Sequence, residues 1–229
     1  LCPRSLQHAR CAKFFISGNP ALYSNGEELM FTVPTVETYS HHMPAMSVQR
    51  SAEAYDGMTS EHSALIDYSY RALKWAVLDQ YNAMVNAGLV VTFQSGDAYA
   101  NSTGMRADVA EGRIKVRQTM GQDYVDLGAD HPMQAIVQTT DGRALRINDV
   151  FRAVHDVFGH YAASAGFGPD GEALAWLTHR STMPDAALLA LWCETRGQNT
   201  WTNWYGRDLP IADRPFAEQK FGVVSSELV

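Results

Sequence analysis

The sequence lacks the features that would assign it at once to a nucleic-acid-binding or membrane class. It has no cluster of Lys and Arg, and its formal net charge of −7 argues against a nucleic-acid surface. No apolar run approaches the ~20 residues that a membrane-spanning helix needs. Internal repeats and low-complexity segments are also missing. What remains is a chain of 229 residues, 46% hydrophobic, which suits one compact globular domain. We therefore expect neither a nucleic acid nor a membrane as partner.

Cysteine is scarce. The chain has three cysteines, an odd number without a Cys-x-x-Cys spacing: Cys2, Cys11 and Cys193. This pattern favours free thiols in a reducing compartment over a disulfide framework, and it predicts a cytoplasmic protein. A pair between Cys2 and Cys11 remains the alternative.

The chain divides into an irregular start and a patterned remainder. Residues 1–58 carry many turn signals and one possible short strand, at residues 29–33. Such a segment would suit packing on an oligomer or assembly partner. Residues 59–229 are predicted to form one catalytic-type domain, which would act on a small-molecule substrate.

Apolar periodicity predicts a long helix over residues 61–87, capped by Thr59 or Ser60 and ended by Gly88. Its buried stripe is predicted to contain Ile66, Tyr70, Leu73, Val77, Tyr81 and Met84. Strands are expected next, with a hairpin turn at Asp141-Gly142 before the last one. They are predicted at residues 89–94, 114–119, 133–139 and 143–147.

From Asn148, a plausible helix cap, the pattern turns helical. The first of these helices has an apolar face made of Phe151, Val154, Val157, Phe158 and Tyr161. A second is predicted at 171–180, and a third runs from about Pro184 to Trp201. The predicted fold class is α+β, mainly α, with a small antiparallel sheet followed by a helical half.

Residues 155–160 read HDVFGH and hold two histidines five positions apart. On a straight α-helix such residues point about 140° apart, whereas residues four apart differ by about 40°. The pair converges only if one residue is inserted, as in a π-bulge, or if His160 lies at the helix end. Gly159 permits either arrangement. Two ordinary core or capping histidines are the alternative to a metal site.

A metal site built on two imidazoles usually needs a carboxylate as well. Glu194 lies in a strongly apolar helix, where a carboxylate is costly unless it is paired or metal-bound. We therefore predict His155, His160 and Glu194 as the metal ligands. A salt bridge from Glu194 to Arg180 or Arg196 is the alternative.

Two further acids are candidates for catalytic roles. Glu172 is predicted as a further ligand or as an acceptor that orients a ligating imidazole, and its place near a helix start explains it equally well. Asp156 is predicted as a hydrogen-bond partner of the site or as a general base, with an exposed helix acid as the alternative. His179 is expected to pack or hydrogen-bond. Structural or surface roles are expected for His41, His42 and His131.

The motif His-acid-x-x-Gly-His, followed by a Glu in an apolar, Trp-containing helix, resembles the catalytic core of the aromatic amino acid hydroxylases. Those enzymes are pterin-dependent non-haem iron monooxygenases. The resemblance covers residues 148–229 and implies Fe(II) bound by the three predicted ligands, with Ser225 and Ser226 near the site. The chain has Asp156 where that family has Glu. No counterpart of the pterin-binding segment is found upstream, which leaves pterin use doubtful.

The same motif is similar to that of the dipeptidyl-peptidase III type of zinc peptidase, with Glu194 inside the segment CETR. That resemblance implies Zn(II) on the same ligands. The predicted function is a mononuclear non-haem iron oxygenase or hydroxylase with a 2-His-1-carboxylate triad. A zinc-dependent, peptidase-like hydrolase is the first alternative. A non-enzymatic structural or assembly protein is the second, and a closed set of His155, His160, Glu172 and Glu194 would favour it.

Overall fold

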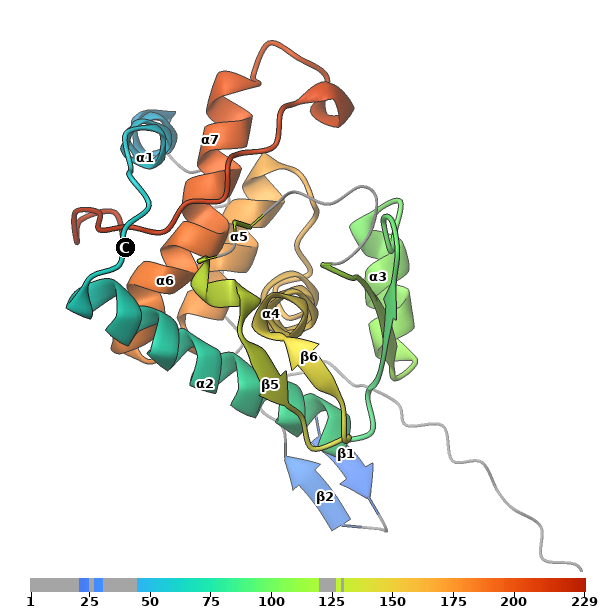
Figure 1. The fold of residues 1–229 in the computed structure, drawn as a ribbon. Helices are drawn as coiled ribbons and strands as arrows, with labels where there is room; N and C mark the ends of the chain where they lie inside the picture. Colours follow the sequence, from blue (N-terminus) through green and yellow to red (C-terminus); the bar gives the residue numbers. More distant parts are fainter. Residues whose placement is uncertain (1–20, 25–26, 31–44, 120–126, 129) are drawn as a thin grey trace, which may run out of the picture.

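The computed structural model describes residues 21–24, 27–30, 45–119, 127–128 and 130–229, and within these it has the predicted α+β, mainly helical fold (Figure 1). None of its described helices is long and apolar enough to cross a bilayer. The strands are β1 (Ala21–Ser24), β2 (Glu27–Met30), β3 (Val90–Gln94), β4 (Arg113–Arg117), β5 (Ile136–Gln138) and β6 (Ala144–Arg146). The α-helices are α1 (Ala45–Asp56), α2 (Ala64–Asn86), α3 (Ser102–Ala110), α4 (Ile147–His155), α5 (Pro169–Arg180), α6 (Leu188–Trp192) and α7 (Gln198–Tyr205). Two π-helical segments are η2 (Asp156–Tyr161) and η4 (Cys193–Gly197), and 3₁₀ turns are η1 (Pro132–Gln134), η3 (Asp185–Ala187) and η5 (Ile211–Asp213).

The long helix α2 forms one wall of the core, as its apolar periodicity predicts. All six residues of the predicted stripe are buried. The helix begins later than expected, because the Ser63 hydroxyl accepts a hydrogen bond from the Ile66 amide and takes the capping role predicted for Thr59 or Ser60. Gly88, with φ +94°, follows the last turn and ends the helix as predicted.

The strands form separate two-stranded sheets in place of one small antiparallel sheet. β5 and β6 pair antiparallel through the predicted Asp141-Gly142 turn, where Gly142 has φ +80°. β3 and β4 pair parallel instead, because α3 carries the chain back across between them. The strand predicted from residue 133 starts at Ile136, since Pro132 opens the 3₁₀ turn η1.

Helix α1 lies inside the stretch that was predicted to be irregular, and it packs along α7 and η4. The irregular prediction is therefore wrong for residues 45–56. β2 overlaps the strand predicted at 29–33. Four residues for which the sequence predicts a role lie outside the described part of the chain: Cys2, Cys11, His41 and His42.

Helix α4 runs through the middle of the molecule, with α2, α3 and α5 around it (Figure 1). Its predicted apolar face is buried along its full length, into η2. Asn148 is not the cap, because the helix begins one residue earlier and the Asn148 amide donates to the Thr119 hydroxyl. The predicted third helix also forms, as η3, α6, η4 and α7 in one continuous run, and it is widened at Cys193–Gly197 by the π-segment η4.

Candidate metal centre

The two histidines of HDVFGH converge because the helix widens between them. Residues 156–161 form the π-segment η2, in which the Ala162 amide donates to the Val157 carbonyl five residues back. The rings of His155 and His160 are consequently neighbours, with centroids 5.1 Å apart and planes at 82°. Of the two arrangements that would let the pair converge, the structure has the inserted residue of a π-segment.

Gly159 allows α5 to approach this widened turn. A Cβ atom at Gly159 would lie 3.0 Å from the Ala175 carbonyl oxygen and 3.2 Å from the Ala175 Cβ. It would also lie 3.2 Å from Cε1 of His155. A side chain here would push α5 away from the histidine pair, and α5 carries Glu172. The glycine therefore sets the distance between the two elements of the site.

His155 is buried and hydrogen-bonded on one side only. Its Nδ1 lies 3.1 Å from Nδ1 of His179, whose Nε2 lies 3.2 Å from Oε1 of Gln80. Its Nε2 is buried and has no hydrogen-bond partner among the described residues. Burial, together with the neighbouring rings of His160 and His179, holds the pKa of His155 well below its ordinary value. The ring is therefore neutral, as a metal ligand must be.

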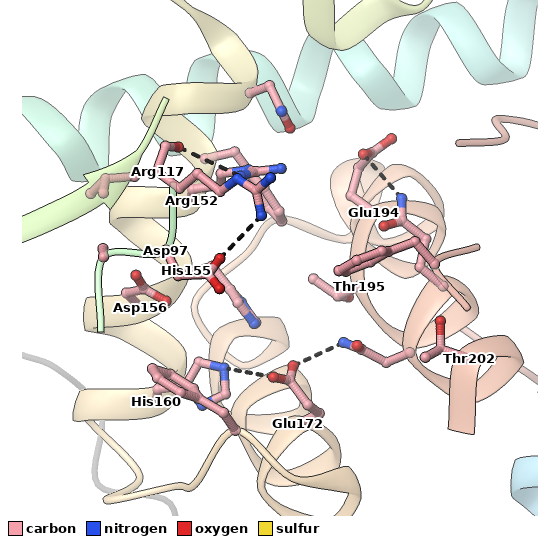
Figure 2. Close-up of a pocket in the computed structure, with 18 of the residues that line it drawn as sticks. Asp97, Arg117, Arg152, His155, Asp156, His160, Glu172, Glu194, Thr195 and Thr202 are labelled. Carbon is pink, nitrogen blue, oxygen red and sulfur yellow. Dashed lines mark hydrogen bonds and ion pairs between the residues drawn. The ribbon is translucent and has the colours of Figure 1, made fainter. Parts of the chain in front are cut away.

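His160 faces Glu172, with 3.4 Å between Nε2 and Oε1 (Figure 2). The other oxygen of Glu172 accepts a hydrogen bond of 2.9 Å from the Asn199 side-chain amide of α7. Burial alone would lower the pKa of His160, but the hydrogen bond and the charge of Glu172 raise it. Two atoms that each lie ~2.1 Å from one cation are themselves roughly 3 to 3.5 Å apart, so this separation suits two ligands of the same ion.

The donor atoms of His155, His160 and Glu172 all lie within 4.8 Å of one another. We call these three residues the triad cluster. Two imidazoles and one carboxylate on one side of a cavity form the donor set of mononuclear iron and zinc sites. The carboxylate of the cluster is that of Glu172, which the sequence offered as a further ligand or an orienting acceptor.

Glu194 lies outside the triad cluster, so the structure does not bring the three predicted ligands together. Figure 2 shows it across the cavity from the two histidines. Its Oε1 accepts a 2.5 Å hydrogen bond from the Tyr70 hydroxyl and lies 3.6 Å from Nε2 of His131. The Gln198 amide lies 3.5 Å from its other oxygen. Burial raises the pKa of Glu194 to about 7, against the lowering effect of these hydrogen bonds.

The environment of Glu194 contains groups that the sequence did not bring forward. Tyr70 was recognised only as part of an apolar stripe, and His131 was expected to be structural or exposed. His131 is buried, which fits the structural role and excludes the surface one, and burial lowers its pKa to about 4. The adjacent Cys193 is a buried free thiol whose Sγ donates to the Gly222 carbonyl over 3.6 Å. No sequence spacing links these residues, because the fold alone brings them together.

Asp156 is half-buried and faces the cavity beside the triad cluster (Figure 2). Burial is the largest cause that raises its pKa, to about 6, and the Glu172 carboxylate adds to the effect. The alternative of a fully exposed helix acid does not hold. Its place beside the cluster is compatible with the predicted role of a general base.

The triad cluster opens onto a cavity of about 620 Å³. Arg117, Arg152 and Glu194 line its other walls. Part of the C-terminal segment closes one side through Phe216, Ala217 and Gln219. Ser225 and Ser226, expected near the site, are exposed and are not among the lining residues. The space is large enough for a small-molecule substrate next to a bound cation.

Comparison of the chain with protein-family models, curated proteins and solved structures gave no match. The resemblances to aromatic amino acid hydroxylases and to zinc peptidases therefore rest on short motifs alone. The triad cluster and its cavity are the features from which a function can be inferred.

Proposed function

We propose that this protein is a mononuclear metal-dependent enzyme of the non-haem iron oxygenase class, with His155, His160 and Glu172 as the metal ligands. The observation that carries the proposal is the convergence of these three donor side chains at the wall of a large cavity. Two imidazoles and one carboxylate suit Fe(II) and leave further coordination positions for dioxygen and substrate. Bound iron would supply the activation of dioxygen.

The open character of the cluster favours an enzyme over a structural metal site. A structural site closes its coordination shell with protein ligands, whereas a catalytic site keeps a position free. Glu194, which would have completed a closed set of four, hydrogen-bonds with Tyr70 on the other side of the cavity. The cation would thus have three protein ligands and a face towards the cavity.

A zinc hydrolase is the second candidate, and the position of Asp156 favours it. This carboxylate faces the cavity beside the cluster, where it could take a proton from a water held near the metal. The ligand set is the same for both metals, so the identity of the bound ion separates the two reactions.

Metal analysis of protein purified without added metal tests the proposal. About one iron per chain, with a ferrous–nitrosyl signal on exposure to nitric oxide, is expected for the oxygenase. Stoichiometric zinc supports the hydrolase. A chain that carries neither metal, and takes up neither Fe(II) nor Zn(II) on reconstitution, contradicts both candidates.

A matched pair of variants tests the ligand assignment. Glu172→Gln is expected to lose metal, because it removes the anionic donor of the triad cluster. Glu194→Gln makes the same carboxyl-to-amide change on the opposite side of the cavity and should keep its metal. The reverse result would transfer the carboxylate role to Glu194.

A further inference from the structure

Four side chains from three parts of the fold form one hydrogen-bonded chain that ends at His155. Thr182, just after α5, lies 2.8 Å from the amide nitrogen of Gln80 on α2. The amide oxygen of Gln80 lies 3.2 Å from Nε2 of His179 on α5. Nδ1 of His179 in turn lies 3.1 Å from Nδ1 of His155. We call this set the His155 relay.

Thr182, at the end of the relay away from His155, fixes which groups donate and which accept hydrogen bonds. The Thr182 hydroxyl has a single proton and lies 2.7 Å from the carbonyl oxygen of His179, which can only accept. The hydroxyl must therefore donate there and can only accept from Gln80. This places the amide NH₂ of Gln80 towards Thr182 and its oxygen towards His179.

The orientation of Gln80 in turn fixes the protons on the two histidines. Since Gln80 presents an acceptor, Nε2 of His179 carries a proton. His179 is fully buried and its ring packs against Phe151 and Phe158, with no carboxylate contact among its described partners. A charged ring would be costly there, so His179 is neutral and its Nδ1 is an acceptor. His155 must then donate from Nδ1.

We infer that Gln80, His179 and Thr182 are positioning residues that hold His155 in the tautomer with the proton on Nδ1 and the lone pair of Nε2 facing the metal position. The inference rests on the proposed function, because a lone pair at Nε2 matters only if a cation binds there. It accounts for the one buried ring nitrogen of His155 that has no partner among the described residues. If the donor and acceptor roles in the relay were reversed, the proton of His155 would lie on Nε2 and would prevent that atom from binding a metal.

The tautomers can be read in the metal-free protein by ¹⁵N NMR of the histidine side chains. His155 is expected to show a protonated Nδ1 and an unprotonated Nε2, and His179 the opposite arrangement. The measurement uses the parent chain and needs no substitution. A protonated Nε2 on His155 in the metal-free protein overturns the inference.

Variants at Gln80 test the consequence for metal binding, with Co²⁺ as the probe. Gln80→Met keeps the approximate volume but removes the acceptor, and it should weaken Co²⁺ binding ~10- to 100-fold. Gln80→Glu keeps an acceptor towards His179 and should bind Co²⁺ at least as tightly as the parent. Gln49→Met is the matched control, because Gln49 bonds only to Glu53 on α1 in the described structure.

The outcomes separate this inference from the proposed function. If the parent binds Co²⁺ and Gln80→Met binds it equally tightly, the relay has no positioning role and the inference is overturned. If the parent shows the expected tautomers but neither binds Co²⁺ nor contains a metal, the proposed function is overturned. Weaker binding in Gln80→Met, with a mixture of His155 tautomers in its NMR spectrum, supports the inference.

Discussion

At the scale of single residues, the burial of Glu194 couples the stability of the protein to pH. Its carboxyl has a pKa of about 7 in the folded chain, against an ordinary value of 4.5. A group with a raised folded-state pKa binds its proton more tightly when folded. The stabilisation is therefore fully present below pH 4.5 and is lost as the pH rises through about 7.

Glu194→Gln should remove this pH dependence while keeping an acceptor for Tyr70. Between pH 4.5 and 7.5 the metal-free parent is expected to lose on the order of 3 kcal/mol more unfolding free energy than the variant. Urea denaturation of both proteins across this range measures the difference. Parallel curves for parent and variant would contradict the assigned pKa shift.

Gly159→Ala should both destabilise the fold and disturb the metal position. The new Cβ would meet the Ala175 backbone and the His155 ring at 3.0 to 3.2 Å, and such overpacking costs ~1–3 kcal/mol. Gly166→Ala is the control, because its Cβ would meet no atom nearer than 3.9 Å. Thermal unfolding and Co²⁺ titration of the two variants are the measurements. Equal effects at both positions would show that close packing at Gly159 is unimportant.

At the scale of elements, α2 has one face in the core and one in solvent. Each face carries a leucine, so the two faces can be compared by the same substitution. Leu73 is fully buried, whereas Leu65 is 53% exposed. Leu73→Ala should cost ~2–5 kcal/mol of unfolding free energy. Leu65→Ala should change it by at most ~0.5 kcal/mol. Chemical denaturation of both variants tests whether the described core face is the right one.

The elements that the sequence predicted well are those with a strong internal pattern. The stripe of α2 and the face of α4 repeat at helical spacing, and the widening found in η2 is one of the two arrangements that the five-residue histidine spacing suggested. α1 and α3 were missed because they are short, with 12 and 9 residues, and contain few large apolar side chains. The parallel pairing of β3 with β4 depends on where α3 packs, which no local pattern records.

The choice between Glu172 and Glu194 could not be made from the sequence for a related reason. Each carboxylate lies on a helix with apolar neighbours, and the sequence allows either one to face the histidines. What separates them is that α5, which carries Glu172, packs directly against η2, whereas Glu194 lies in the second π-segment, η4. The sequence linked Gly159 only to the shape of its own helix and did not indicate that α5 approaches there.

At the scale of the whole molecule, a bound cation would link two parts of the chain. His155 is the last residue of α4 and His160 lies in η2, whereas Glu172 belongs to α5 and is held by Asn199 of α7. The site is therefore complete only in the folded protein. Metal binding should consequently stabilise the fold as a unit.

Co²⁺ at about 100 times its dissociation constant should add ~2.7 kcal/mol of stability. For a chain of this size that corresponds to a rise in Tm of ~5–10 °C. His160→Ala, which lacks one ligand, should show no rise under the same conditions. A thermal-shift or calorimetric scan measures both. An equal rise in the variant would place the Co²⁺ elsewhere on the molecule.

The C-terminal segment that closes one side of the cavity also shields the sulfur of Cys193, through Gly222. We expect an alkylating reagent to reach this buried sulfur only when the structure around it opens, so the labelling rate at Cys193 should report movement of the segment against it. A compound that fills the cavity and holds the segment in place would slow that labelling. One buried thiol thus offers a screen for ligands that works before the reaction has been identified.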